Sequence, residues 1–466
     1  MARRPTSPAH PVPVLALAAA LAASVAGVVV AGEASTASAD DPGRGSAIFI
    51  HPDGASAATW AIGRAMMVGP DGDLEWDRLP HMALYRGHLT DSLTGTSNGG
   101  ATVHAVGLKV AASAYGRTEA GPQGRDLTDA DGHQLSVALQ AIRAGLPVGV
   151  VQTGIATEPG TGCFLAPAVE RGAHEDIAAG LLASGADVLL GGGERWFLPD
   201  DATGVHGPGA RTDGRDLVAE AKAMGYRVIH TRAELLSLPP DVDRVLGLFA
   251  HGHTFNAASE ETLRERELPR WTADAPTVAE MTEVALGILG RDDRRFLLVV
   301  EEEGTDNFGN VNNASGVLEA LARADAAIGV ARRFVAARPD TLLLTCADSD
   351  GGGMRMIGLR TPPGEQPPAT LPERDANGAP IDGVDGAGTA PFVAAPDRFG
   401  RRLPFAVSWA AFGDVSGGIL VRAEGFLADR VRGSMDNAEI ARLIREALFG
   451  GQSVPPAAAD ASPGTG

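Results

Sequence analysis

The chain has 466 residues, 44% of them hydrophobic and 21% charged, which suits one large α/β domain or two ordinary ones. Its 39 basic and 58 acidic residues give a formal net charge of −19. This balance argues against nucleic acid as a partner, because nucleic-acid-binding proteins normally carry a basic face. The same charge would repel an anionic substrate unless cations at the site reverse the local potential.

The N-terminus has the features of an export signal. An arginine pair at residues 3–4 precedes an apolar stretch over residues 14–32, and Ala37-Ser38-Ala39 forms a small-residue cleavage pattern. We therefore predict a signal peptide over residues 1–39, cleaved after Ala39, and a periplasmic or extracellular protein without stable membrane insertion. The apolar stretch is also just long enough for an uncleaved membrane anchor, and the export route stays open.

Short apolar runs alternate with amphipathic stretches from about residue 45 to about residue 350. Strand–helix alternation of this kind favours a mostly parallel central sheet covered by helices on both faces, a three-layer α/β/α sandwich. Strands are predicted at 47–50, 147–151, 187–190, 242–249, 296–300 and 341–346, and helices at 135–143, 175–183 and 315–337.

The segment 361–402 breaks this alternation, because it contains Pro362-Pro363-Gly364 and several Asp-Gly or Gly-Ala pairs. It predicts a loop-rich insertion. Strand character returns at 405–409 and 419–421, and 437–448 predicts a closing amphipathic helix. The expected organisation is a signal peptide at 1–39, one catalytic domain at 40–450 and a disordered tail, rich in Pro, Ala, Ser and Gly, at 451–466.

Carboxylate side chains follow several of the predicted strands. In open α/β sheets, ligands bind beyond the carboxyl ends of the strands, so acids delivered there would converge. Converging buried carboxylates repel one another unless cations lie between them, and hard divalent ions held by oxygen atoms are suited to that role. The pattern therefore predicts a divalent-metal site. The acids are Asp53, Glu301, Asp306, Asp348 and, in the turn after 405–409, Asp414.

A serine-containing segment, Gly95-Thr96-Ser97-Asn98-Gly99-Gly100-Ala101-Thr102, leads into a helix-compatible run at 103–110. A serine at a helix N-terminus faces unpaired N–H groups and the positive end of the helix dipole, which favour a phosphoryl group and a partly ionised alcohol. Ser97 is therefore the predicted nucleophile, with Thr96 and Ser92 as alternatives. An ordinary capping residue remains the competing interpretation.

Together these segments resemble the alkaline phosphatase family over most of residues 45–450. The family's nucleophile segment reads Asp-Ser-Ala, then small residues to Thr, and ends Ala-x-Gly-Val-Lys; residues 96–109 fit it without a gap and put Ser97 on the phosphorylated serine. The resemblance implies a phosphoric monoester hydrolase that acts on small phosphate monoesters through a phosphoserine.

The same resemblance implies the metal ligands and the phosphate-binding residue. Asp53 fits the acid that bridges two metal sites, and Glu301 and Asp306 keep the five-residue spacing of the family's Glu and Asp ligands. Asp348 stands where the family has Ala-Asp-His. The remaining counterparts are Arg171 for the phosphate-binding arginine, and Thr161 or Glu158 for the hydroxyl or acid at the third metal site.

The chain departs from the family pattern at three ligands. Asn310, Ser349 and Asp414 stand where the usual enzymes have zinc-binding histidines, and Thr96 replaces the acid before the nucleophile. Oxygen ligands suit Mg²⁺, Ca²⁺ or Mn²⁺, whereas Zn²⁺ favours nitrogen and sulfur. We expect two or three divalent cations, with Mg²⁺ at one site and Mg²⁺, Ca²⁺, Mn²⁺ or Zn²⁺ at the others. The histidines interpreted as structural are His51, His104, His251 and His253.

Two other functional classes stay open. One is a phosphodiesterase or sulfatase-like hydrolase on the same scaffold, and the other is a catalytically inactive relative that binds divalent metal. The preferred ester and the oligomeric state, monomer or homodimer, do not follow from the sequence. Cys163 and Cys346 could pair in an oxidising compartment, although two buried thiols are the simpler interpretation.

Overall fold

A computed structural model describes residues 43–360 and 366–451. The predicted signal peptide, residues 361–365 of the predicted insertion and residues 452–466 of the predicted tail lie outside the described residues, so those interpretations stay predictions. Across the described part of the chain, no helix is both long enough and apolar enough to cross a membrane.

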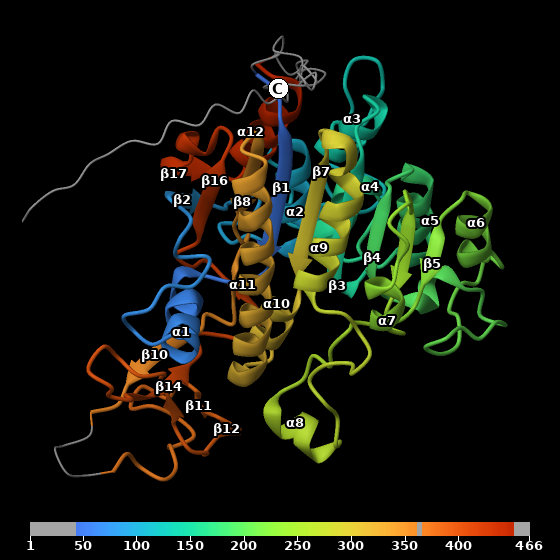
Figure 1. Cartoon of the computed structure of the whole chain (residues 1–466). Coiled ribbons are helices and arrows are strands. Elements are labelled where there is room, and N and C mark those ends of the chain that lie inside the picture. Colours follow the sequence, from blue (N-terminus) through green and yellow to red (C-terminus); the bar gives the residue numbers. More distant parts are fainter. Residues whose placement is uncertain (1–42, 361–365, 452–466) are drawn as a thin grey trace, which may run out of the picture. The chain divides into compact units, whose positions relative to one another are not determined.

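A large mixed sheet occupies the centre of the described chain (Figure 1). Neighbouring strands are mostly parallel, and β16 is antiparallel to both of its neighbours. This confirms the mostly parallel sheet predicted from the alternating pattern. In spatial order its strands within residues 43–451, leaving out 361–365, are β17 (Arg432–Asp436), β2 (His81–Arg86), β16 (Leu420–Gly425), β8 (Thr341–Thr345), β1 (Ser46–Pro52), β7 (Leu297–Glu302), β3 (Val148–Ile155), β4 (Val188–Gly192), β6 (Val245–Leu248) and β5 (Arg227–Ile229).

The two faces of the central strands pack into different hydrophobic clusters. On β1, Ala47 and Phe49 join one cluster, whereas Ile48 and Ile50 join another, as the two-residue period of a strand requires. Figure 1 shows α9 and α11 on one side of the sheet. Helices on both faces confirm the predicted three-layer α/β/α sandwich. The first cluster includes α2 (Ser97–Val106), α4 (Pro159–Leu165) and α12 (Ala438–Phe449), and the second includes α1 (Ala57–Met67), α9 (Val278–Leu289) and α11 (Ala314–Ala337).

Local capping sets several helix starts. At α9, the Thr277 hydroxyl accepts the Glu280 N–H at 3.2 Å, and the Glu280 carboxylate accepts the Thr277 N–H at 2.9 Å. Two otherwise unpaired backbone donors are thereby satisfied. The remaining helices and 3₁₀ turns are α3 (Val137–Arg143), α5 (His174–Ser184), η1 (Glu194–Phe197), α6 (Leu217–Ala223), α7 (Arg232–Leu236), α8 (Glu260–Glu265), η2 (Arg291–Asp293), α10 (Gly304–Gly309) and η3 (Ala428–Arg430).

The chain after β8 forms two small antiparallel sheets in place of further strand–helix units. The described part of the predicted loop-rich insertion contains three short strands. The predicted strand at 405–409 belongs to one of these small sheets and not to the central sheet. One sheet consists of β10 (Arg355–Gly358), β11 (Ile381–Gly383), β12 (Gly386–Ala387), β13 (Phe392–Val393) and β14 (Pro404–Ser408), and the other of β9 (Asp350–Gly351) and β15 (Asp414–Val415).

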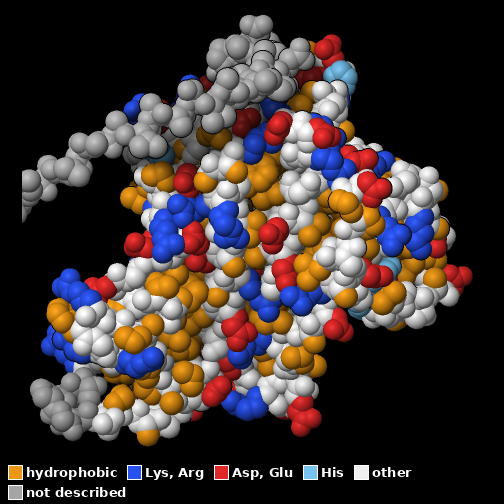
Figure 2. Space-filling view, in the orientation of Figure 1, with side chains coloured by type: hydrophobic (Ala, Val, Ile, Leu, Met, Phe, Trp, Pro, Cys, Tyr) orange, Lys and Arg blue, Asp and Glu red, His pale blue; other side chains and the backbone are white. Residues whose placement is uncertain are grey.

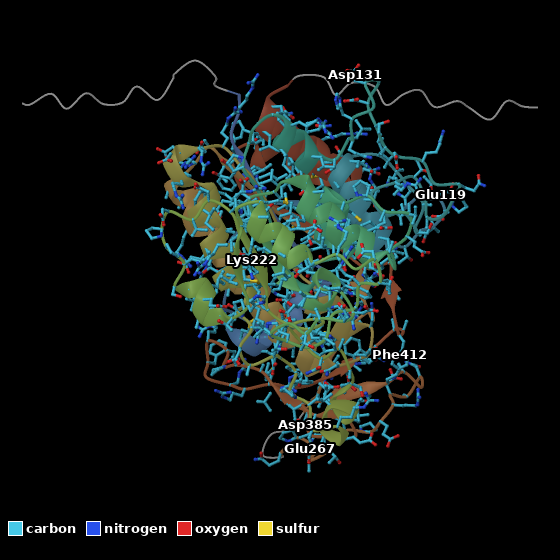
Figure 3. All side chains as sticks on the ribbon, turned by 90° about the vertical axis from the view of Figure 1, so that its right-hand side faces the viewer. Glu119, Asp131, Lys222, Glu267, Asp385 and Phe412 are labelled. Carbon is cyan, nitrogen blue, oxygen red and sulfur yellow. The ribbon has the colours of Figure 1, made fainter. Side chains whose placement is uncertain are left out.

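A third hydrophobic cluster attaches the larger of these sheets to the helices. Trp409, next to β14, packs in the same cluster as Phe308 of α10 and Val317 of α11. The Trp409 ring also donates its N–H to Asp382 at 2.6 Å. Figure 3 shows Phe412 at the edge of the molecule in the connection that follows β14, and 76% of its surface is exposed. This connection brings β15 back toward the central sheet.

The surface carries charged side chains of both signs. On the face shown in Figure 2, acidic and basic side chains lie intermixed with hydrophobic ones. Some pair across elements, such as Arg332 with Glu75 and Glu424 at 2.6 and 2.7 Å. Exposed or partly exposed pairs of this kind contribute little to stability individually. The acids that bear on function lie in the interior.

Cys163 and Cys346 are both free and buried. The alternative of a disulfide between them is therefore wrong, and the interpretation as buried thiols is confirmed. Burial raises the pKa of the Cys163 thiol to about 12. Because the thiolate is the reactive form of cysteine, this thiol is inert.

Candidate active site

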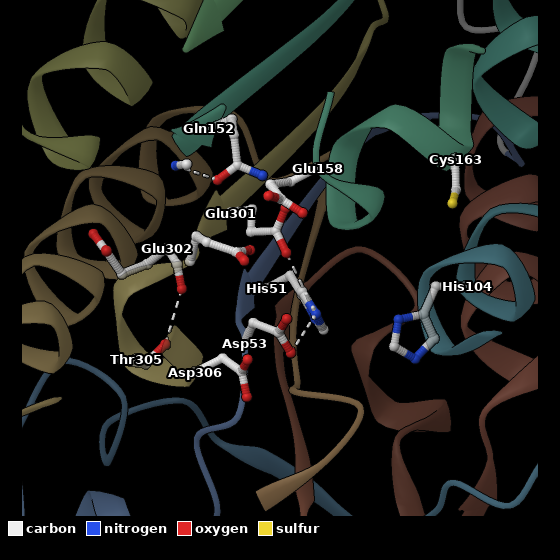
Figure 4. A network of polar contacts seen from close by, with 12 residues as sticks. His51, Asp53, His104, Gln152, Glu158, Cys163, Glu301, Glu302, Thr305 and Asp306 are labelled. Carbon is white, nitrogen blue, oxygen red and sulfur yellow. Dashed lines mark hydrogen bonds and ion pairs between the residues drawn. The ribbon is translucent and has the colours of Figure 1, made fainter. Parts of the chain in front are cut away.

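Three of the predicted acids lie at the carboxyl ends of three adjacent strands. Asp53 directly follows β1, Glu301 lies near the end of β7, and Asp348 follows β8 by three residues. All three are buried. Because β1 is hydrogen-bonded between β7 and β8, their side chains converge at one edge of the sheet, as expected for an open α/β sheet. Figure 4 shows Asp53, Glu301 and Asp306 close together.

Asp414 reaches the same place by a route that the sequence interpretation missed. It lies in β15, which pairs with β9, and not in a turn at the edge of the central sheet. Its neighbour Asp306 lies in α10, directly after β7. The prediction that all these acids come from ends of strands in one sheet is therefore wrong for Asp414, because the strand at 405–409 belongs to a separate sheet. The structure nevertheless brings Asp306 and Asp414 together.

Asn310 links these two carboxyl groups. Its Nδ2 donates to Asp306 Oδ2 at 2.8 Å and to Asp414 Oδ1 at 3.2 Å. Its Oδ1, the atom that would bind a cation, accepts the Gly352 N–H at 3.2 Å. Asn310 was expected to be a metal ligand; in this orientation its amide forms a hydrogen-bonded bridge between two acids. Ser349, which is buried, also lies beside Asp414, so the three positions that replace histidines meet in space.

The acids strongly shift one another's pKa values. Burial and then the charge of Asp53 raise the pKa of both Asp306 and Asp348 well above the ordinary range. Burial also raises the pKa of Glu301 to about 8, although His51 opposes this shift. Asp53 behaves differently: burial would raise its pKa, but His51 and other neighbours hold it below the usual range. Perturbed carboxyl groups gathered in one place are typical of functional sites, which makes this cluster the candidate active site.

Many carboxyl oxygens of this cluster have no hydrogen-bond partner among the described residues. A buried carboxylate without a partner is costly, and divalent cations are bound by such oxygens. The donor set therefore fits a group of divalent cations. The atoms are both carboxyl oxygens of Asp53, both of Asp348, Oδ1 of Asp306 and Oε1 of Glu301.

Ser97 is the first residue of α2 and is 5% exposed. The Thr96 hydroxyl caps the helix by accepting the Gly99 N–H at 3.2 Å, and it donates to the Ala112 carbonyl at 2.7 Å. Thr96 is thus engaged in capping, whereas the Ser97 side chain lies beside Asp53. The helix begins six residues before the run at 103–110 that was expected to be helical, because the small residues that follow the cap are helical too.

Gly100 allows α2 to approach the acids closely. A Cβ at this position would lie 2.3 Å from Asp348 Oδ2. Only a residue without a side chain therefore fits between the first turn of α2 and this carboxyl group. Ser92, the other alternative nucleophile, donates its hydroxyl to the Thr94 carbonyl at 2.7 Å in the preceding loop.

Arg171 lies beside the nucleophile segment. Its Nη2 donates to the carboxylate of Glu158, and its Nη1 donates to Asn98 Oδ1 at 3.4 Å. Burial would lower the pKa of Arg171, but Glu158 and then Glu303 raise it, so the guanidinium stays charged. Thr96 has no charge and cannot form an ion pair with an arginine. The carboxylate that binds Arg171 is therefore that of Glu158.

The two candidates for the third metal site have different surroundings. The Thr161 hydroxyl is buried and has no hydrogen-bond partner in the described part of the chain. The preceding Gly160 lies against Glu301, since a Cβ there would come 1.8 Å from Glu301 Oε1. Glu158 is occupied by Arg171 and lies 3.9 Å from His253 Nε2. Of the two candidates, Thr161 is therefore the one with a buried oxygen that lacks a hydrogen-bond partner among the described residues.

His51 and Gln152 belong to the site, although neither was predicted there. In register, His51 of β1 and Gln152 of β3 flank Glu301 of β7. Gln152 Nε2 donates to Glu301, and His51 Nε2 lies 3.3 Å from Asp53 Oδ1 and 3.9 Å from Glu301 Oε1. The signal was present in the sequence: residues two apart in a strand share a face, so a side chain at 51 points with that at 53.

A second possible group of metal ligands lies in the loop before α3. Asp129, Asp131 and His133 bring ligand atoms within 4.8 Å of one another. Asp131, labelled in Figure 3, and His133 are exposed. Asp129 accepts the backbone N–H groups of Asp131 and His133 at 3.0 and 2.9 Å, which is the bonding of an ordinary acidic turn. No metal site is assigned to this loop.

Comparison with known sequences identifies one family. The family model described as "Alkaline phosphatase" matches residues 47–449. The tissue-nonspecific isozyme of alkaline phosphatase from Rattus norvegicus is 30% identical over 308 residues, which cover 60% of this chain and 57% of that protein. The membrane-bound alkaline phosphatase from Bombyx mori is 29% identical over 317 residues, covering 60% and 55%. The matched region thus spans less than two thirds of these relatives.

Solved structures share the fold. The alkaline phosphatase of Thermus thermophilus superposes with a TM-score of 0.66 at 24% identity, covering 88% of this chain and 92% of that one. The alkaline phosphatase of the Antarctic bacterium TAB5 gives a TM-score of 0.64 at 20% identity, covering 87% and 99%. At these identities the likeness concerns the architecture: a large, mostly parallel sheet flanked by helices.

Proposed function

The chain belongs to the alkaline phosphatase family, and from this premise we propose that it is an exported phosphomonoester hydrolase with Ser97 as its nucleophile. Family and fold support a metal-dependent phosphoester hydrolase. One observation supports phosphomonoester hydrolysis by Ser97: a buried group of acids with unpaired oxygens lies beside the first turn of α2. That arrangement supports a role for the Ser97 hydroxyl as a nucleophile next to a site suited to divalent cations.

Two or three divalent cations would be held by this cluster. When bound, they supply the positive charge that stabilises an ionised serine oxygen and a departing alcohol oxygen. Asp53 lies among the other acids and would bind more than one of the cations. We assign Asp306 and Asp414 to one position, with Asn310 as their bridge; Asp348 and Ser349 to the position beside Ser97; and Glu301 and Thr161 to a third, with Glu158 as the alternative to Thr161.

The chain's own groups orient the reaction. Ser97 Oγ forms a bond to phosphorus while the bond from phosphorus to the alcohol oxygen breaks, which leaves a phosphoserine. Water then attacks phosphorus, and phosphate leaves as the Ser97 hydroxyl is restored. The backbone N–H groups and dipole at the start of α2 favour the phosphoryl oxygens. Arg171, which lies beside Asn98, would bind two of those oxygens by paired hydrogen bonds.

Chromogenic substrates test this proposal. Chelated protein receives Mg²⁺, Ca²⁺, Mn²⁺ or Zn²⁺ singly and is assayed at alkaline pH with p-nitrophenyl phosphate, bis(p-nitrophenyl) phosphate and p-nitrophenyl sulfate. We expect preferential hydrolysis of the monoester, loss of turnover on chelation and recovery on metal addition. Faster turnover of the diester or the sulfate would identify a different hydrolase on this scaffold, and bound metal without turnover would identify an inactive relative.

Replacement of the nucleophile tests its role. Ser97→Ala should lower monoester turnover by about 1,000-fold or more while leaving the metal content unchanged. Ser92→Ala is the matched control, since Ser92 lies in the loop that leads to α2 and its hydroxyl bonds only to Thr94 among the described residues. Equal activity in the Ser97 and Ser92 variants would contradict the assignment of Ser97.

A further inference from the structure

We propose that His51 is a nitrogen ligand of the cation held between Asp53 and Glu301. The inference rests on the proposed metal-dependent function. It assigns an imidazole to a position for which the family resemblance implies only oxygen ligands, and it moves nitrogen ligation from the positions of Asn310, Ser349 and Asp414 to the opposite end of the acid cluster.

The backbone aims this side chain at the site. His51 lies in β1 and Asp53 directly follows the strand, two residues later, so the extended backbone aims both side chains to the same side. His51 is also in register with Glu301 on the neighbouring parallel strand β7. One ligand atom from each of the three residues lies within 4.8 Å of the other two. Atoms bound to one ion at about 2.1 Å are separated by roughly 3 to 3.5 Å, close to the 3.3 Å between His51 Nε2 and Asp53 Oδ1.

A hydrogen bond on the other ring nitrogen sets the role of Nε2. His51 Nδ1 lies 2.8 Å from the Cys346 carbonyl oxygen, which can only accept, so Nδ1 carries the hydrogen. The Nε2 atom of a neutral imidazole then presents a lone pair. This atom is buried and has no hydrogen-bond partner within the described ranges. Metal-binding histidines are typically oriented in this way, with the second nitrogen bonded to a carbonyl or a carboxylate.

Packing holds the ring in this orientation. The His51 ring lies against Phe49, with centroids 5.9 Å apart, and against His104, edge to face at 5.5 Å. His104 in turn is held by Tyr85, whose hydroxyl lies 2.7 Å from His104 Nε2. Figure 4 shows His51 turned toward Asp53 and Glu301, with His104 on its other side. The imidazole is thus preorganised toward the acids.

A nitrogen ligand changes which cation is preferred. Carboxylates and hydroxyls alone suit Mg²⁺ and Ca²⁺, whereas one imidazole with two carboxylates favours Mn²⁺, Co²⁺ or Zn²⁺. We therefore expect the position between Asp53 and Glu301 to select a transition metal over Mg²⁺, and the position between Asp306 and Asp414 to keep an all-oxygen environment.

Manganese bound to the full chain tests the assignment directly. Chelated protein is titrated with Mn²⁺, the bound metal is quantified, and pulsed electron paramagnetic resonance detects ¹⁴N coupled to Mn²⁺. We expect ¹⁴N coupling in the parent, replaced by ¹⁵N coupling when histidine is ¹⁵N-labelled. This readout needs no substitution, so it does not depend on the folding of a variant.

Two histidine variants locate the nitrogen. His51→Asn keeps an N–H group for the Cys346 carbonyl and removes Nε2, so it should abolish the coupling and weaken Mn²⁺ binding at this position by at least about 10-fold. His206→Gln is the control, because His206 Nε2 lies 3.0 Å from the His230 and Leu248 carbonyl oxygens and does not pack on the His51 ring. It should keep both the coupling and the affinity.

The outcomes separate this inference from the proposed function. Bound Mn²⁺ without histidine nitrogen coupling in an active parent would overturn the role of His51 and leave the phosphatase proposal standing. Coupling that survives in His51→Asn would do the same. A parent that binds no divalent cation and hydrolyses no phosphomonoester would overturn both.

Discussion

The two ends of the acid cluster hold their carboxyl groups in different ways. At one end, His51 faces Asp53 and Glu301 with a ring nitrogen at 3.3 and 3.9 Å. At the other end, Asn310 bridges Asp306 and Asp414 with an amide nitrogen at 2.8 and 3.2 Å. An imidazole can carry a positive charge or offer a lone pair, whereas an amide N–H₂ group can only donate.

This difference appears in the acidities of the two ends. Burial would lower the pKa of His51, but Asp53 and the other nearby acids raise it to about 10, and His51 in turn helps to lower the pKa of Asp53. Burial, Asp53 and Asp414 raise the pKa of Asp306 well above its ordinary range. A neutral amide aligns two acids without balancing their charge. The Asp306 end therefore depends more completely on a bound cation.

Removing the acid shared by both ends should have the largest effect. Asp53→Asn should lower kcat/KM for a phosphomonoester by about 100- to 1,000-fold and weaken cation binding at both ends, because Asp53 is central to each. Steady-state kinetics and metal analysis measure this. Asp382→Asn is the control, since the new side chain can still accept the Trp409 N–H and should leave activity intact. If Asp53→Asn kept its bound metal and its activity, Asp53 would not be an acid that both ends of the cluster share.

The stability of the chelated protein should fall as the pH rises from 5 to 9. The pKa of Glu301 is about 8 in the fold, above its ordinary value of 4.5, so its contribution is complete below pH 4.5 and is lost as the pH rises through 8. The pKa of His51 is likewise raised, from 6.5 to about 10, so its contribution to stability is also lost as the pH rises. Asp53 has a lowered pKa and acts only at lower pH. Together these groups should cost several kcal/mol of stability over this interval.

Denaturant unfolding at each pH, with chelator and with Mn²⁺, measures this dependence. Added cation should flatten the curve, because the acids then fold in their ionised, metal-bound form. If the stability of the chelator-treated protein instead rose steadily from pH 5 to 9, these carboxyl groups would not keep their protons in the folded state.

Crowding the helix that carries Ser97 should have a moderate effect. In Gly100→Ala the new Cβ would lie 2.3 Å from Asp348 Oδ2, so α2 or the acid must shift. We expect about a 10- to 100-fold loss of kcat. Gly287→Ala in α9 is the matched control, because a Cβ there meets nothing within 4 Å in the described chain. It should keep full activity and gain about 0.5 to 1 kcal/mol in stability. Equal kinetics in both variants would count against close contact between α2 and Asp348.

The smallest effect is expected at the amide bridge. Asn310→Ala removes the two hydrogen bonds to Asp306 and Asp414 and the one from the Gly352 N–H. It should cost about 1 to 3 kcal/mol of stability, with only a few-fold loss of activity. Metal analysis shows whether Asn310 is a bridge or a ligand. Loss of one equivalent of bound cation in this variant would restore the ligand role expected from the sequence and make the two ends more alike than the hydrogen bonds indicate.

Local patterns were sufficient for much of the architecture. The alternation of apolar and amphipathic segments predicted the mostly parallel sheet and its flanking helices. Acids that directly follow buried strands, such as Asp53 and Asp348, were placed at the sheet edge because parallel strands end on the same side. Ser97 was placed at a helix start because its segment leads into a helix-compatible run, and in the structure Thr96 supplies the capping hydroxyl. Each inference needed only neighbours in sequence.

Contacts between distant segments decided the rest. Asp414 enters the cluster through β15, whose partner β9 lies more than sixty residues earlier in the chain. Glu158 takes the partner role that Thr96 cannot perform for Arg171, and the orientation of the Asn310 amide depends on Gly352. Only the tertiary structure showed that His51 of β1 turns its Nε2 atom toward Glu301 of β7. The two-residue period of a strand determines the face on which a side chain lies, but the register between strands determines which residues it meets.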